Sequence, residues 1–350
     1  MPNPPAGPIT EEALADACRA QNQRKAAAPG LSHALLAGIA RGVLRALARL
    51  LRLTETTGHG LPFLTEGRGV LIPKTTDAEH ANDQRPLTLL PAVYILWAKA
   101  RLPGMRAWLA GWIHPGQVGA VPGRDIRLAC LDLAGGIEAA RLNDQPLSGC
   151  HLDVSKAFNG VHHDMVEFLG RRYGAPVETL VGELGFLRSL TVRFRWGRAL
   201  GEAWRPVHGL PQGGPLSPLW LLLLLNPWHR AIDRRSPELQ AVSCVDDRAL
   251  HGVWEEVEGA LQFTAAYDEA ALLANNWGKR RFGMWAGKSR CSTKLMVWRL
   301  SPSTPSSGSA CSSTPPEPCA ANSVKIASRR RRKWWSASGA CHSQWTSAPN

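Results

Sequence analysis

Three aspartates in two short segments are the residues of this chain best suited to chemistry. Asp153 ends the strand-like run 149–152, and the pair Asp246-Asp247 follows the strand-like run 241–245. Mg²⁺ prefers hard, anionic oxygen ligands, and two such ions about 3.5–4 Å apart can clamp both oxygens of a phosphoryl transfer. The pattern therefore predicts a two-metal site, although aspartates that only close a turn would give the same sequence pattern.

A glycine- and proline-rich segment separates the two acidic motifs. Residues 209–218 read Gly-Leu-Pro-Gln-Gly-Gly-Pro-Leu-Ser-Pro. Glycines let a backbone approach a substrate closely. A structural turn before a helix that begins near Pro215 would look similar. The residues alone leave both interpretations open.

Hydrophobic periodicity places these motifs on an α+β framework, with a sheet covered by helices on one face. We expect helices over 11–53 (interrupted at Pro29-Gly30), 92–109, 125–142, 160–172, 218–234 and 256–274. Strands are expected over 69–72 and 149–154, further helix and strand within 176–206, and a hairpin over 241–254 with the aspartate pair at its turn.

The composition is that of a basic, folded protein. Of 350 residues, 44% are hydrophobic, which excludes global disorder, and the formal net charge is +13. Such an excess favours a polyanionic partner, although GC-rich coding would also enrich arginine. Eight cysteines without zinc-ligand spacing indicate reduced thiols and an intracellular protein. No apolar run is long enough to span a membrane.

The composition changes after about residue 290. Residues 291–350 are rich in Ser, Pro, Ala and Thr, lack periodicity, and are predicted to be disordered. They contain one basic run, Arg329–Lys333. This run is either a nuclear-import or nucleic-acid patch, or part of an out-of-frame extension.

From about residue 66 to 284, the chain resembles the reverse transcriptase domain of non-LTR (LINE-type) retrotransposons. The ordered segments that carry the resemblance are 69–74 with 85–90, 117–124, 152–158, 209–218, 245–247 and 276–279. Departures are Cys244-Val245 before the acid pair, Gly214, and Ala120 in place of phenylalanine. The resemblance implies right-hand fingers and palm over 61–290, preceded by a helical N-terminal segment, 1–60.

By this resemblance, Asp153 and Asp246 bind both catalytic Mg²⁺ ions, for which Mn²⁺ can substitute. Asp247 supports them, and the backbone carbonyl of Val154 also reaches a metal. Lys279 corresponds to a lysine that protonates the departing pyrophosphate. A charged turn is the alternative interpretation of Lys279, because two arginines follow it.

The resemblance also assigns the nucleotide-binding residues. Lys74 and Arg85 hold the incoming triphosphate, and Gln212 and Gly213 contact the template and the nascent base pair. Phe158 corresponds to a residue whose ring excludes a ribose 2′-hydroxyl. The alternative interpretation is that Phe158 simply packs in the core. The implied partners are an RNA template, a DNA primer and deoxynucleoside triphosphates.

No primer-grip segment and no helical thumb are recognisable after Trp285. A catalytically decayed remnant that only binds nucleic acid is therefore the main alternative to an active polymerase. Two other classes of polymerase fit the sequence less well. A group II intron maturase should carry a basic domain downstream, and none is recognisable here. A viral RNA-templated RNA polymerase usually has a glycine before the acid pair, where this chain has Val245.

Overall fold

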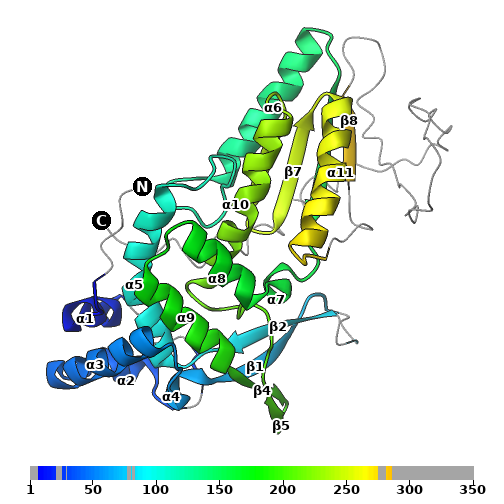
Figure 1. Cartoon of the computed structure of the whole chain (residues 1–350). Helices are drawn as coiled ribbons and strands as arrows, with labels where there is room; N and C mark the ends of the chain where they lie inside the picture. The colour runs from blue at the N-terminus through cyan, green and yellow to red at the C-terminus, as the bar shows by residue number, and fades with distance from the viewer. Residues whose placement is uncertain are drawn as a thin grey trace. The chain divides into compact units, whose positions relative to one another are not determined.

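Two four-stranded sheets carry the predicted motifs (Figure 1). The computed structural model describes residues 7–20, 26–28, 30–76, 80, 83–274 and 281–285. In spatial order, the first sheet consists of β2 (Gln84–Leu89), β1 (Glu66–Pro73), β4 (Thr191–Trp196) and β5 (Ala199–Trp204). The second consists of β6 (Gln240–Cys244), β7 (Asp247–Gly252), β3 (Leu147–Asp153) and β8 (Arg281–Trp285).

Alternation along the strands explains how the second sheet is covered. Cys150 and Leu152 of β3 and Leu250 of β7 are buried on one face. They share a core with Trp228 and Val257, from two helices that pack on that face, α10 (Ser217–Arg235) and α11 (Trp254–Ala270) (Figure 1). Residues of opposite parity, including both strand-end aspartates, point to the other face.

The N-terminal helices belong to a larger core. Leu44 and Leu51 lie in the same buried cluster as Trp97 and Leu180. The helices around this cluster are α1 (Glu11–Arg19), α2 (His33–Ala37), α3 (Arg41–Thr57), α4 (Pro62–Thr65), α5 (Ala92–Ala110) and α9 (Val177–Ser189). All described residues fall within one compact unit, Met1–Ser301. The division of this unit at residue 60 stays a prediction.

Several predicted elements differ in detail from those observed. The helix expected over 160–172 is broken at residues 161–162, so that α7 (Ala157–Gly160) precedes α8 (His163–Arg172). Two sheets replace the single one expected, and β8 was not anticipated. The helix expected over 125–142 is α6 (Ile126–Leu142). The predicted tail, 291–350, lies outside the described residues.

No helix in the described part of the chain is both long enough and apolar enough to cross a membrane.

Candidate active site

The aspartates of the two acidic motifs meet at one end of the second sheet. Asp153 and Asp247 are direct partners in the antiparallel β3–β7 register. Residues directly opposite each other in such a pair project from the same face of the sheet. Asp246 lies in the tight β6–β7 turn, where Val245 adopts a left-handed conformation (φ 60°). Thus the structure brings together two strand-end carboxylates and places the third beside them.

A histidine that the sequence reasoning missed shares this face. His151 lies two residues before Asp153 on β3, and its Nε2 is 3.6 Å from Asp247 Oδ1. Strand alternation could have identified it, because positions 151 and 153 must face the same side.

The donor chemistry of this sheet end suits Mg²⁺, since carboxylate oxygens on neighbouring strand ends are hard ligands. Among the described residues, no three or more His, Cys, Asp or Glu side chains lie close enough to one another to hold a metal ion. The assignment of Asp153, Val154, Asp246 and Asp247 as metal ligands therefore stays a prediction.

A buried ion pair anchors the strand that carries Asp247. Arg248 donates from both terminal nitrogens to the Asp268 carboxylate of α11, at 2.9 and 2.6 Å. Both side chains are fully buried, and the guanidinium carbon lies 5.1 Å from the centre of a Trp228 ring. A bidentate arginine–carboxylate pair has a narrow geometry. Its position directly after Asp247 therefore restricts the start of β7.

The segment 116–119 covers the outer edge of β6. Val118 N–H donates to the Ser243 carbonyl (2.9 Å), and Ser243 N–H donates to the Gly116 carbonyl (2.8 Å). A Cβ atom at Gly119 would lie 2.5 Å from Val245 N, so only glycine fits against the turn that holds Asp246. This close approach explains why the segment 117–124 has glycine at position 119.

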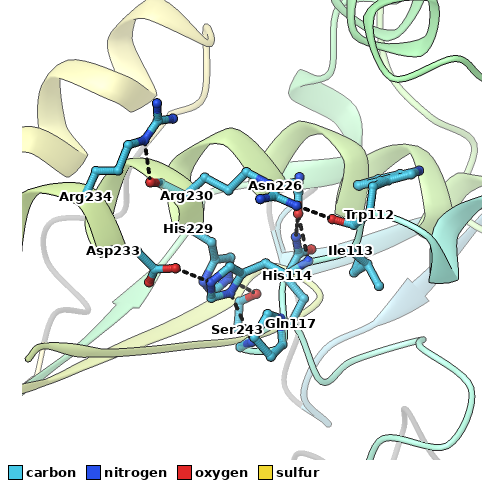
Figure 2. A network of polar contacts seen from close by, with 12 residues as sticks. Trp112, Ile113, His114, Gln117, Asn226, His229, Arg230, Asp233, Arg234 and Ser243 are labelled. Atoms are coloured by element: carbon cyan, nitrogen blue, oxygen red, sulfur yellow. Dashed lines mark hydrogen bonds and ion pairs between the residues drawn. The ribbon is translucent and has the colours of Figure 1, made fainter. Parts of the chain in front are cut away.

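A polar network, shown in Figure 2, holds this segment in place. Gly116 N–H donates to His114 Nδ1 (3.0 Å), so His114 Nε2 carries the proton and donates to Asp233 (2.6 Å). Asn226 Oδ1 accepts from His114 N–H and from the Gln117 side chain. Arg124, at the end of the segment 117–124, donates to the His114 and Gln117 carbonyls.

The Ser243–His229 pair within this network is structural. The two side chains lie 2.8 Å apart, but both are buried, and His229 Nδ1 has no hydrogen-bond partner among the described residues. Burial, followed by the nearby His114, lowers the pKa of His229 well below its ordinary value. A neutral, shielded histidine without a carboxylate partner lacks the arrangement of a nucleophilic triad.

The glycine-rich loop is tied to the segment after Asp153. Leu210 N–H donates to the Phe158 carbonyl (2.7 Å), and the Gln212 side chain donates to Asn159 (3.2 Å). Thr88 N–H of β2 donates to the Gln212 carbonyl (3.1 Å). The loop with Gln212 and Gly213 therefore joins the two sheets beside Phe158, which is partly buried against the core.

A second missed histidine fastens the same loop. His163 Nε2 donates to the Gly209 carbonyl (2.9 Å), and the side chain is buried. Burial, the largest cause, lowers the pKa of His163. No local motif signals the contact, because 46 residues separate its partners.

The other predicted site residues lie on the first sheet or outside the described chain. Lys74 follows β1, and Arg85 belongs to β2, where it is paired with Ile72. Both side chains are exposed, as a role in binding a triphosphate requires. Lys279 lies outside the described residues.

Comparison with known proteins identifies relatives. No family model matches the chain. It is 28% identical over 197 residues to the retrovirus-related Pol polyprotein from type-2 retrotransposable element R2DM of Drosophila melanogaster, covering 53% of this chain and 17% of that protein. It is 27% identical over 245 residues to a protein of transposon TX1 of Xenopus laevis, covering 65% and 18%.

Among solved structures, a telomerase from Candida tropicalis superimposes with a TM-score of 0.49 at 10% identity, covering 75% of this chain and 49% of that one. The chain spans less than a fifth of the R2DM and TX1 proteins. As its motifs predicted, the chain is similar to the Pol polyprotein of an R2 retrotransposable element and to a protein of transposon TX1.

Proposed function

We propose that this chain contains the fingers and palm of an RNA-directed DNA polymerase of the non-LTR retrotransposon type. It would extend a DNA primer on an RNA template with deoxynucleoside triphosphates. The observation that carries the proposal is the pairing of Asp153 with Asp247 at one sheet end, with Asp246 adjacent, in a relative of retrotransposon Pol polyproteins. The right-hand arrangement remains part of the proposal.

In this proposal, Asp153 and Asp246 hold two Mg²⁺ ions, supported by Asp247 and the Val154 carbonyl. When bound, such ions lower the pKa of a hydroxyl nucleophile and neutralise charge that develops on a phosphoryl group. The protein's own contribution is orientation. The buried pair of Arg248 with Asp268 and the edge segment 116–119 support the turn from two sides.

The remaining residues would bind and select the nucleotide. Lys74 and Arg85 offer a point charge and a bidentate fork to the triphosphate. Gln212 and Gly213 sit on the loop that joins the segment after Asp153 to β2, which suits contact with a base pair. Lys279 would supply the proton for pyrophosphate.

Primer extension with purified protein tests the assignment of the carboxylates. We expect synthesis only with Mg²⁺ or Mn²⁺, and a loss of at least about a hundredfold in Asp153→Asn and Asp246→Asn, since each factor of ten corresponds to about 1.4 kcal/mol. Asp164→Asn is the matched control, because that side chain is 93% exposed and pairs only at the surface. Undiminished synthesis by either site variant would reject the assignment.

Phe158→Ala tests sugar selection. Removing the ring should raise the ratio of ribonucleotide to deoxynucleotide incorporation if the ring occupies the 2′-hydroxyl position. An unchanged ratio would mean that Phe158 serves only the core against which it packs.

A remnant that binds nucleic acid without polymerising remains the second candidate function. Primer extension separates the two functions, because such a remnant would bind a primed template but would not extend the primer with either Mg²⁺ or Mn²⁺.

A further inference from the structure

The β4–β5 hairpin exposes tryptophan and arginine side chains together at the edge of the first sheet. Every residue of the outer strand β5 is exposed. Trp196 is 69% exposed, Trp204 54% and Leu200 49%. Large rings left in water at a sheet edge call for a functional explanation, because burying such a ring would contribute to stability.

The strand register explains why these rings stand outside the core. One face of β4 carries every second residue, namely Val192, Phe194 and Trp196. Trp204 of β5 is paired with Val192 and therefore lies on the same face. Phe194 packs on Gly69, where an added Cβ would lie 2.5 Å from the ring. The ring centres of Phe194 and Trp204 are 6.3 Å apart, so the Trp204 ring has an aromatic neighbour on the same face of the sheet. Trp196 is paired with the small Ala199, which leaves its ring uncovered.

The charge of the hairpin favours an anionic partner. Residues 191–205 contain one acidic side chain, Glu202, and four basic ones, a difference of +3 (Arg193, Arg195, Arg198 and Arg205). Arg193 lies 3.8 Å from Glu66, and Arg195 donates to the Gly197 carbonyl. Arg198 in the turn and Arg205 after β5 are exposed.

We propose that the β4–β5 hairpin binds single-stranded nucleic acid, with bases stacked on Trp196 and Trp204 and phosphates held by Arg198 and Arg205. Aromatic rings interleaved with arginine suit unpaired strands, because every base offers a face for stacking, whereas duplex bases already stack on each other. The proposal deepens the proposed function and rests on it in one respect: the bound strand would be template that is not yet copied.

The position of the hairpin agrees with that assignment. β4 runs parallel to β1, with Glu66 level with Thr191 and Val70 level with Arg195. The β4–β5 turn therefore lies at the same end of the sheet as Lys74, which follows β1. A second copy of the chain fits this edge less well, because exposed Arg198 and Arg205 flank the edge strand and its register with β4 is irregular, which disfavours strand-to-strand pairing.

The test is binding of labelled oligonucleotides by the full chain, without nucleotides. The probes are a single-stranded RNA of about 12 nucleotides, the DNA of the same sequence, and a blunt duplex. We expect the double variant Trp196→Ala/Trp204→Ala to bind single strands at least about tenfold more weakly, with duplex binding unchanged. Phe168→Ala is the matched control, because Phe168 is an aromatic residue 64% exposed outside the hairpin.

The charge arm uses Arg198→Ala/Arg205→Ala. It should reduce the log–log salt slope for single strands by about 1.4, as expected for two lost phosphate contacts. Equal weakening of RNA and DNA would assign the surface to single strands in general, and a larger loss for RNA would assign it to the template. Both outcomes support the proposal.

Unchanged single-strand binding by the tryptophan variant would overturn the proposal, as would equal loss on the duplex. Light scattering after size-exclusion chromatography adds a further arm, since a dimer lost only in the tryptophan variant, with binding intact, would assign the edge to a second copy. The binding assay needs no catalysis, so a parent protein that binds but does not polymerise would refute only the proposed function.

Discussion

The two sheets of this protein place arginine in opposite environments. In the second sheet, Arg248 is fully buried and paired with Asp268 beneath the strand that carries Asp247. In the first sheet, Arg195 stands in solvent and donates to a neighbouring backbone carbonyl. Buried charge has a narrow permitted geometry, which suits a sheet that must hold carboxylates in place. Exposed charge adapts to a partner, which suits the binding of a flexible strand that we propose for the β4–β5 hairpin.

Removing the charge from each arginine tests this contrast most directly. Arg248→Met should lower the free energy of unfolding by about 3–5 kcal/mol, because it leaves the Asp268 carboxylate buried and unpaired. Arg195→Met should stay within about 0.5 kcal/mol of the parent, as is usual for an exposed side chain. Urea denaturation followed by circular dichroism measures both.

The double variant Arg248→Met/Asp268→Leu provides the control for the first effect. It should recover most of the lost stability, because two apolar side chains can replace a buried ion pair. If Arg248→Met and Arg195→Met destabilised the protein equally, the contrast between the sheets would be wrong.

A pH-dependent effect of similar or smaller size is expected from the helical layer beside the first sheet. Glu183 in α9 is fully buried and accepts hydrogen bonds from the Tyr94 hydroxyl, at 2.9 and 3.1 Å. Burial raises the pKa of Glu183 from 4.5 to about 7. The folded protein therefore holds this proton at pH values where the unfolded chain has released it.

The sign follows from proton linkage. The stabilisation by protonated Glu183 is fully present below about pH 4.5 and is lost as the pH rises towards 7. The loss is about 3 kcal/mol for a pKa of 4.5 in the unfolded chain and about 7 in the folded protein. Glu183→Gln should remove this loss, so the difference in stability between variant and parent should grow in favour of the variant from pH 5 to pH 8. A constant difference across denaturation curves in that range would contradict the assignment.

The smallest effect concerns the loop that joins the two sheets. His163→Ala removes the hydrogen bond to the Gly209 carbonyl and should destabilise the protein by about 1–2 kcal/mol. It should also raise the KM for nucleotide more than it lowers kcat, because Gln212 and Gly213 lie on the same loop. His59→Ala is the control, since His59 is exposed and its Nδ1 hydrogen-bonds the carbonyl of Thr57, two residues earlier. Equal effects of both variants would show that His163 does not position the loop.

The sequence by itself determined the features that depend on neighbouring residues. Strand-like apolar runs predicted a strand over 149–154 and a hairpin over 241–254 with Asp246-Asp247 at its turn. The structure has β3 (Leu147–Asp153) and a hairpin of β6 and β7 that turns at residues 245–246. The order of the motifs predicted a relationship to retrotransposon Pol proteins, which the comparison with R2DM and TX1 confirms. Local propensity and motif spacing carry this information because they are written in contiguous residues.

Only the tertiary structure decided which distant residues meet. It placed Asp153 directly opposite Asp247, paired Arg248 with Asp268, and fastened the loop at Gly209 through His163. It also added β8 beside β3 and left Trp196 and Trp204 exposed at a sheet edge. Strand register and side-chain contacts across tens of residues arise from packing of whole elements, and no local pattern encodes them.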